Sequence, residues 1–320
     1  MNQNGLLNIV ALGTAMQTYK LCSEAMLLRL FRLAGVGDFE DRAAIVDRLN
    51  GLKFLNEKIY MEIFDKGFEL VRKHTLDSID IISIFDPRYP SSLLITSRPP
   101  ALLYVKGNSN LLGESPGVAV VGSREVSSAG AEITRRIVSR LVKEDYCIVS
   151  GLAIGVDCAA HRAAISAKGK TIAVLAHGLE EAKPKQNSRL GEEILDSGGA
   201  WVSEFPIGRA PSKPTFVQRN RIQVGLSAGS VIVEAALNSG SMTQAEFCNQ
   251  EKRPLFCVVP EDATNRLNLN CEGTQSLVNK NAAHPLRTKE DYEHLVCTLN
   301  KGREVIANHV HDYSNVKSFL

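Results

Sequence analysis

The sequence lacks most of the patterns that would assign a catalytic or membrane function directly. No Cys-x-x-Cys pair occurs, which excludes the common zinc-ribbon and thioredoxin-like motifs. No apolar run approaches the ~20 residues that cross a bilayer. The most apolar N-terminal stretch, residues 6–16, follows no basic residue and resembles no signal peptide, so we expect no membrane contact and a cytoplasmic protein.

Charge of either sign is also not in excess. The 320 residues carry 37 Lys and Arg against 35 Asp and Glu, a net charge of +2, so only the placement of charge can indicate a polyanionic partner. The seven cysteines are an odd number, and several lie in apolar runs, which favours reduced core residues. Cys158 and His161 have the spacing of half a metal site, but no second pair completes it, and we expect no metal.

The first 76 residues have helical periodicity. Apolar positions recur with helical spacing in residues 27–33, 43–49 and 60–71. Gly35-Val36-Gly37 is either a simple capping turn or the turn of a helix-hairpin-helix element, whose backbone N–H groups would face a phosphate; the capping turn is favoured.

From residue 77 the pattern changes to short β-branched runs that alternate with helices. We predict strands at 79–84, 101–105, 118–121, 147–149, 171–175, 201–202, 230–233 and 255–259, and helices at 127–144, 156–167, 187–196, 217–226, 242–251, 272–279 and 288–295. This alternation is typical of an α/β fold: an extended Rossmann-like, doubly wound, mostly parallel sheet, here with a small N-terminal helical domain. The predicted domains are 1–76, 77–300 and a C-terminal tail, 301–320, without a winged helix.

Function in such folds lies in the loops after the strands. Gly122, Ser123 and Arg124 follow one strand and offer a tight turn, a hydroxyl and a forked cation. Ser150, Gly151 and Gly155 follow the next, in a stretch that is neither G-x-G-x-x-G nor a P-loop, so a bound NAD or ATP cofactor is disfavoured.

Asp157 and His161 share a helix face just beyond that stretch, four residues apart. We expect them to order the loop by local hydrogen bonds. A catalytic carboxylate–imidazole pair is the alternative, but no nucleophile accompanies them.

Residues 205–233 carry the strongest signal, because they contain four cations and no Asp or Glu. Cations follow a phosphate backbone and aromatic faces stack on bases without reading sequence, so the segment predicts a single-stranded nucleic-acid site; a solvated loop with core aromatics is the alternative. Its prolines predict an extended loop before the helix at 217. The residues concerned are Phe205, Arg209, Lys213, Phe216, Arg219, Asn220 and Arg221.

A further loop contains Gly240 and Ser241 and precedes a predicted helix. Small residues at a helix N-terminus leave room for a phosphate, so this loop is a further candidate phosphate site. Ser241 and Gln244 have the spacing of a capping box.

Together these blocks resemble the DprA/Smf family of DNA-processing proteins over roughly residues 79–297. They are Val120 to Arg124, Val149 to His161, Thr171 to Leu175, Arg219 to Ser227, Val233 to Ala235 and Ser239 to Ser241. The resemblance implies a cytoplasmic homodimer, not an enzyme, that protects incoming single-stranded DNA and loads the RecA recombinase during natural transformation. It implies that Gly122, Ser123, Arg124, Ser150, Gly151 and Gly155 hold phosphate and that Lys213, Phe216, Arg219 and Arg221 contact DNA.

The chain departs from the family pattern in several loops. Ile154 stands where arginine is common, Gln244 where threonine is usual and Glu261 where glycine is usual; Ala176-His177-Gly178 and Lys183-Pro184-Lys185 also differ. A mobile-element or defence role therefore stays open. The rival functions are a nucleotide sensor and a nucleoside-monophosphate hydrolase, for which Gly240, Ser241 and Glu246 would form the site.

Overall fold

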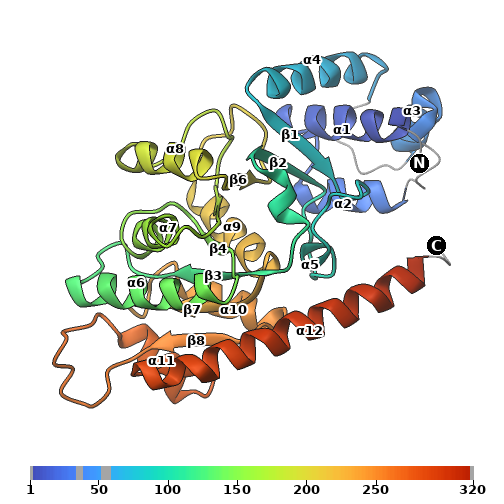
Figure 1. The fold of residues 1–320 in the computed structure, drawn as a ribbon. Coiled ribbons are helices and arrows are strands. Elements are labelled where there is room, and N and C mark those ends of the chain that lie inside the picture. The colour runs from blue at the N-terminus through green and yellow to red at the C-terminus, as the bar shows by residue number, and fades with distance from the viewer. Residues whose placement is uncertain (1–2, 34–38, 52–58, 318–320) are drawn as a thin grey trace.

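A computed structural model describes residues 3–33, 39–51 and 59–317 (Figure 1). The helices predicted for the N-terminal region are present: α1 (Gln3–Thr18), α2 (Glu24–Leu33), α3 (Arg42–Gly51) and α4 (Glu62–Leu76). The glycine turn at 35–37 lies outside the described residues.

The predicted mostly parallel sheet is confirmed. Within the described residues nine strands form one sheet in the order β1-β2-β6-β5-β4-β3-β7-β8-β9, with β1 and β2 antiparallel to their neighbours and the others parallel. The strands are β1 (Ile79–Ser83), β2 (Leu102–Gly107), β3 (Gly117–Val121), β4 (Ile148–Ser150), β5 (Thr171–Val174), β6 (Ala200–Ser203), β7 (Ser227–Ile232), β8 (Leu255–Val258) and β9 (His284–Leu286).

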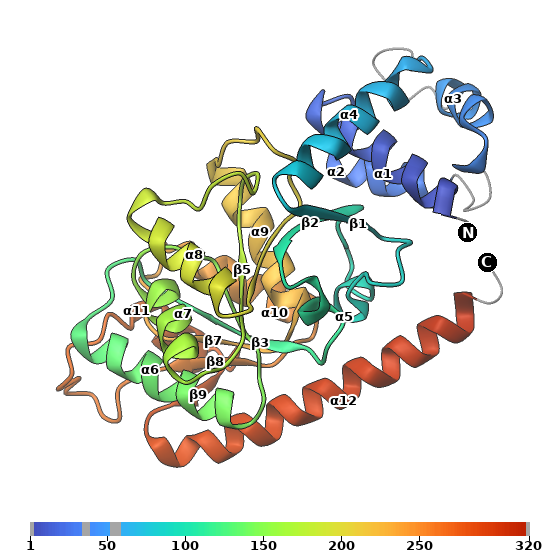
Figure 2. The same ribbon diagram turned by 45° about the horizontal axis from the view of Figure 1, so that its top comes forward.

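Helices cover both faces of this sheet, so the architecture is doubly wound (Figures 1 and 2). The helices α6 (Ser128–Lys143), α7 (Val156–Ser166), α8 (Ser188–Asp196) and α12 (Tyr292–Lys317) pack on one face, and α9 (Lys213–Gly225), α10 (Met242–Gln250) and α11 (Glu272–Asn279) on the other; α5 (Ser91–Leu94) lies against α9 and α12. Successive residues of a strand point to opposite faces of the sheet and belong to two different cores. Val120 and Val231 pack beneath α6, whereas Val121 and Ile232 pack beneath α9 and α10. Both faces of each central strand are thus buried, as continuous apolar runs require.

The N-terminal helices share their core with the sheet. One apolar cluster runs from α1 and α2 through β1 and β2 to Trp201 on β6. Tyr104 of β2 is fully buried and donates to Gln17 Oε1 over 2.6 Å, while the backbone N–H of Ile207 donates to His74 Nε2 over 3.0 Å. Figures 1 and 2 show these helices at one end of the molecule, beyond β1 and β2.

Several elements differ from the sequence prediction. Helix α9 begins at Lys213 and not at 217, because Ser212 and Thr215 form a capping box and Pro214 fits the first turn; the predicted extended loop is therefore wrong there. Strand β9 was not predicted, and α12 continues to Lys317, across the boundary expected at 300. Ser241 caps α10 without a side-chain hydrogen bond, so the predicted capping box is also wrong.

Candidate nucleic-acid interface

The candidate site lies where the winding of the sheet reverses. From β3 the chain winds outward through β4, β5 and β6, and α9 then returns it to β7 on the other side of β3. Ligands of doubly wound sheets bind beyond the carboxyl ends of the strands at this switch point. A cavity of about 600 Å³ opens there, lined by the loop after β3, by α9 and by the loop between β7 and α10.

Most of the predicted phosphate and DNA contacts line this cavity. They are Gly122, Ser123, Arg124, Lys213, Phe216, Arg219, Asn220, Gly240 and Ser241. The four that do not are Ser150, Gly151, Gly155 and Arg221. The structure therefore brings together the loop after β3, helix α9 and the loop before α10, which lie between residues 122 and 241 of the sequence.

Arg124 and Lys213 provide the accessible positive charge of the cavity. Both side chains are exposed, and neither forms an ion pair with any residue that the structure describes. The Arg124 guanidinium lies 5.5 Å from the centre of the half-buried Phe216 ring, a cation–π contact. Two cations and one aromatic ring thus line the same cavity, the combination that a single strand needs for its phosphates and bases.

A second hollow of about 460 Å³ adjoins the first. The two share Arg124, Ala153 and Phe216, and the second adds Lys183 and Lys185 from the segment before α8. The sequence marked this segment only as a departure from the family pattern. Lys183 forms an ion pair with Glu181 over 3.1 Å, so only Lys185 adds an unpaired cation of the described residues to this hollow.

The glycine loop after β4 is held by Asp157 and His161, as predicted. Asp157 Oδ2 accepts hydrogen bonds from the N–H groups of Gly151 (3.1 Å) and Ala153 (3.4 Å). His161 Nε2 accepts from the N–H of Leu152 over 3.3 Å. Both side chains are buried and accept hydrogen bonds from the loop backbone, which supports the loop-ordering role over the catalytic one.

The hydrogen bonds of His161 also fix its tautomer. The Thr171 hydroxyl donates to the Ile148 carbonyl, so it accepts from His161 Nδ1, 2.7 Å away. The ring therefore carries its proton on Nδ1 and is neutral. Burial, with a smaller contribution from the Arg219 charge, lowers the pKa of His161 to about 3. Neither ring nitrogen is left for a metal, and no group of three possible metal ligands occurs among the described residues.

Arg219 lies beneath the cavity and not on its rim. It is 7% exposed, and its Nη1 donates to the Val174 carbonyl over 2.8 Å. Gly151 packs directly on the guanidinium, which leaves no room for a Cβ atom there. Burial lowers the pKa of Arg219, and the nearby Asp157 carboxylate opposes that shift. The predicted DNA contact at Arg219 is therefore better described as a buried support of the loops.

Arg221, also predicted to contact DNA, lies outside the cavity altogether. Its Nη2 donates to the Glu204 carboxylate in a tight ion pair, in which Glu204 is fully buried. Burial raises the pKa of Glu204, and the Arg221 charge counters this rise. Arg221 faces the junction with α1 and α2, where Gln17 Nε2 bonds both the Glu204 carbonyl and the Glu24 carboxylate. Its guanidinium is not available to DNA.

The remaining predicted residues also have structural partners. The Ser150 hydroxyl is fully buried and donates to the Val120 carbonyl over 2.7 Å, so it cannot hold a phosphate. Gly155 has φ of +85° and packs on the backbone of Ser123 and Arg124, which only glycine permits. Asn220 Nδ2 donates to Thr243 Oγ1 over 2.7 Å and thereby fixes the loop of Gly240.

Several residues of the cavity were missed by sequence reasoning. Gln223 and Gln244 are fully buried yet line it, together with Ser239 and Asn270. The sequence signal for Gln223 is its helical spacing from Arg219 and Asn220, which places the three polar side chains on one face of α9. Glu246, which the hydrolase alternative requires, is exposed on α10 and does not line the cavity.

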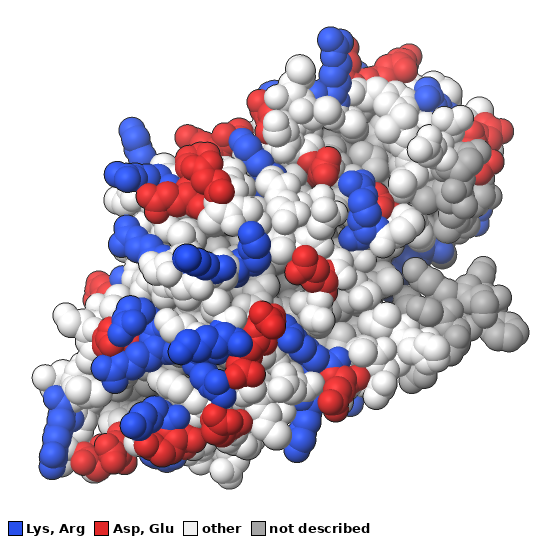
Figure 3. Space-filling view, viewed as in Figure 1, with Lys and Arg blue, Asp and Glu red and all other residues white. Residues whose placement is uncertain are grey.

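The face shown in Figure 3 carries basic and acidic side chains side by side, without a large field of one sign. On α6 the pairing is specific: Arg135 and Arg136 both bind Glu132, and Arg140 binds Glu144 and Glu293. Such solvated pairs leave little net charge for a polyanion, so the free cations of the cavity are distinguished by their lack of acidic partners.

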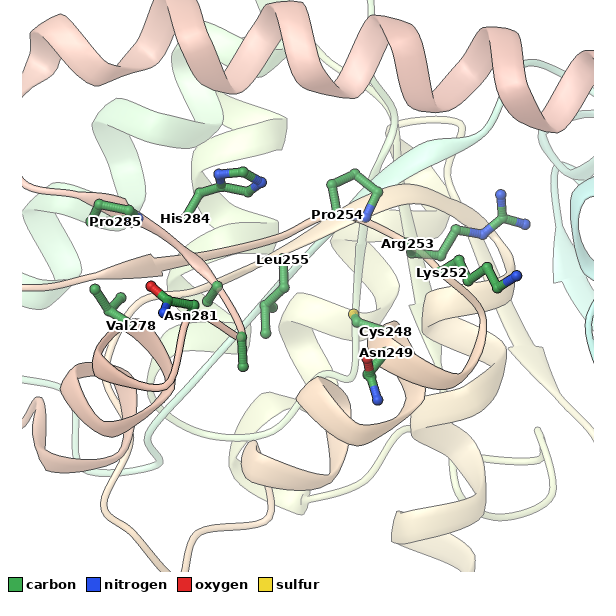
Figure 4. A pocket seen from close by; sticks show the side chains of 12 residues that line it. Cys248, Asn249, Lys252, Arg253, Pro254, Leu255, Val278, Asn281, His284 and Pro285 are labelled. Atoms are coloured by element: carbon green, nitrogen blue, oxygen red, sulfur yellow. The ribbon is translucent and has the colours of Figure 1, made fainter.

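A separate hollow of about 590 Å³ lies near the amino ends of β8 and β9 (Figure 4). Its Lys252 and Arg253 side chains extend away from Leu255 and Asn281. Arg253 Nη2 instead donates to the Ser92 carbonyl over 3.1 Å. No convergent set of polar groups forms there among the described residues, so we assign it no part in the site.

Comparison with protein families gives one decisive match. The model of the family described as DNA recombination-mediator protein A matches residues 80–296, more than half of the chain. The chain belongs to this family. The predicted resemblance to DprA/Smf proteins is thereby confirmed.

Sequence similarity to individual Smf and DprA proteins supports the same family assignment. The chain is 35% identical over 221 residues to protein Smf of Synechocystis, covering 67% of the chain and 55% of that protein. It is 42% identical over 170 residues to protein Smf of Escherichia coli, covering 53% and 45%. To DNA processing protein DprA of Streptococcus pneumoniae it is 38% identical over 203 residues, covering 63% and 71%. The match thus spans about half the length of the two Smf proteins.

Solved structures of the family confirm the fold. DprA of Streptococcus pneumoniae superposes with a TM-score of 0.70 at 31% identity, covering 91% of this chain and 97% of that one. DprA of Helicobacter pylori, described for its single-stranded DNA binding mode, superposes with a TM-score of 0.60 at 30% identity, covering 70% and 96%. Across the described residues of this chain, no helix combines the length and apolarity that a membrane span requires.

Proposed function

We propose that this chain binds single-stranded DNA, without base-sequence specificity along most of the strand, in the cavity at the switch point. The observation that carries the proposal is the pair of exposed, unpaired cations, Arg124 and Lys213, that line the same cavity as Phe216. Phosphates would meet the cations and bases would stack on the ring. Family membership and the single-stranded DNA binding of the Helicobacter pylori relative support the same conclusion.

The test is fluorescence anisotropy of a labelled oligo-dT at two salt concentrations, with duplex DNA as competitor. We expect tight binding that weakens with salt and that duplex DNA competes for poorly. Absence of binding at low salt would exclude a DNA-binding role for the cavity and would turn attention to mononucleotide ligands.

We propose further that the chain performs no covalent chemistry. Asp157 accepts from backbone N–H groups, His161 bonds a backbone N–H and the Thr171 hydroxyl, and Glu246 lies outside the cavity. Incubation with nucleoside monophosphates should release no free base. Base release that is lost in a Glu246→Gln variant would establish the hydrolase instead.

Membership of the family also supports a role in DNA recombination as a cytoplasmic homodimer that loads RecA onto the protected strand. Sedimentation of the full chain tests the dimer. The rate at which RecA ATPase activity appears on oligo-dT, at limiting RecA, tests loading. We expect the chain to shorten the lag, and an unchanged lag at saturating chain would contradict the proposal.

A further inference from the structure

Two glutamates share one arginine where the N-terminal helices meet the sheet. Glu204, directly after β6, is fully buried and pairs with Arg221 of α9. Glu24, half-buried at the start of α2, lies next to it, because Gln17 Nε2 donates to the Glu24 carboxylate over 2.6 Å and to the Glu204 carbonyl over 3.2 Å. A single amide of α1 therefore holds both glutamates in one cluster.

The hydrogen bonds of this cluster leave one carboxyl oxygen unsatisfied. Both hydrogens of the Gln17 amide are used, and its Oε1 accepts from the Tyr104 hydroxyl over 2.6 Å. Arg221 contacts only one oxygen of Glu204, and both Glu204 Oε1 and Arg221 Nη1 have no partner among the described residues. An ionised carboxylate can only accept hydrogen bonds, whereas a protonated one also donates. A proton bound in the cluster would add a donor of the kind that is missing.

The charges around the two glutamates do not balance. In the described part of the chain, Arg221 is the only residue that forms an ion pair with either of them. Arg209, in the segment before α9, adds a second positive charge from a greater distance. Burial raises the pKa of Cys22, before α2, and of Tyr89, before α5, so these two groups stay neutral. The charge of Arg32 on α2 acts on Tyr89. Two negative charges thus meet one paired positive charge.

This arrangement favours binding of a proton by the pair. Two neighbouring carboxylates in a buried place cannot both ionise freely, because each charge disfavours the other and burial disfavours both. Burial, together with the Glu204 charge, raises the pKa of Glu24 from 4.5 to about 7. Burial also raises the pKa of Glu204, against the opposing charge of Arg221.

We propose that Glu24 and Glu204 share one proton and form, with Arg221, a proton-operated clasp between the N-terminal helices and the sheet. With the proton bound, these three side chains carry no net charge and the clasp is closed. Release of the proton leaves two like charges, which push α2 away from the segment after β6. The inference goes beyond the proposed function and does not depend on DNA binding.

The direction of the pH effect follows from where the proton is held. The folded chain keeps a proton on Glu24 that the unfolded chain releases above pH 4.5. Stability from this proton is fully present below pH 4.5 and is lost as pH rises through 7. Burial of His161 changes stability in the opposite direction, so the pH profile of the wild type alone does not isolate the clasp. A variant without the Glu24 charge isolates it.

The experiment compares urea unfolding of the wild type and of Glu24→Gln from pH 5.5 to pH 8. The glutamine can still accept from Gln17 but carries no charge at any pH. We expect the unfolding constant of the wild type, divided by that of the variant, to rise roughly 5- to 30-fold over this range. Simple damage to packing would change that ratio by the same factor at every pH.

The matched control is Glu69→Gln, because Glu69 is an exposed acid on α4, in the same group of helices. Its ratio to the wild type should not vary with pH. A Glu24→Gln ratio that stays within about 2-fold across the range overturns the inference, because no proton is then held at the junction. A ratio that falls as pH rises also overturns it, since Arg221 would then keep Glu24 ionised.

Discussion

The salt dependence of DNA binding provides a quantitative test of which cations meet phosphate. Arg124 and Lys213 are exposed and unpaired in the described structure, whereas Arg219 is buried and Arg221 is paired with Glu204. Each phosphate contact on a single strand contributes ~0.7 to the slope of log K against log salt. The double variant Arg124→Ala, Lys213→Ala should therefore have a slope shallower by ~1.4.

In practical terms, the affinity advantage of the wild type over the double variant should be ~7-fold smaller at 200 mM salt than at 50 mM. The assay is anisotropy titration of labelled oligo-dT at four or more salt concentrations. Arg189→Ala is the matched control, since Arg189 is exposed on α8 and pairs only weakly with Glu193 over 3.0 Å. An unchanged slope in the double variant would show that the strand binds elsewhere and would refute the reasoning.

Three further predictions concern the supports of the site. Gly151→Ala pushes a methyl group into a buried guanidinium and should lower the free energy of unfolding by ~1–3 kcal/mol in urea titrations, whereas Gly240→Ala, at an open position, should not. Glu204→Gln leaves the charge of Arg221 buried without its counter-ion and should destabilise by ~3–5 kcal/mol; a loss below ~1 kcal/mol would contradict the buried pair. Because the pKa of His161 falls from 6.5 unfolded to about 3 folded, the unfolded chain binds the extra proton, and stability should drop as pH falls below 6.5. His161→Gln should flatten that dependence between pH 6.5 and 5 by ~1–2 kcal/mol in thermal or urea melts, and an identical pH profile would argue against a neutral buried ring.

The central elements could be predicted because their signals are local. Buried strands such as Val118 to Val121 are continuous apolar runs, and the glycines after β3 and β4 mark the loops that meet at the switch point. Strand β9 could not be predicted in this way, since His284 and Pro285 are poor strand formers and only pairing with β8 orders them. The extension of α12 left a signal that was missed: Val296, Leu299 and Ile306 recur with helical spacing and are buried.

The site itself was predicted only at the level of loops. Sequence shows four cations in residues 205–233, but the partner of Arg221 is a glutamate 17 positions earlier that the fold brings beside it. Which cations face solvent is decided by tertiary packing, as Arg219 beneath Gly151 also shows. The same holds for Gln223 and Gln244, which line the cavity because of how α9 and α10 pack together and not because of their local sequence.

The apolar cluster that joins the N-terminal helices to β1, β2 and β6 determines whether the chain unfolds in one step or in two. Because Tyr104 of β2 is fully buried against Gln17 and His74 of the N-terminal helices, neither part keeps a closed interior without the other. Melting should then be a single cooperative event and not two successive ones. The hydrogen bond from Ile207 to His74 sits within that cooperative unit, and Ile207 lies six residues before Lys213. We therefore expect the stretch of chain before α9 to open only with the global fold and not as an independent flap.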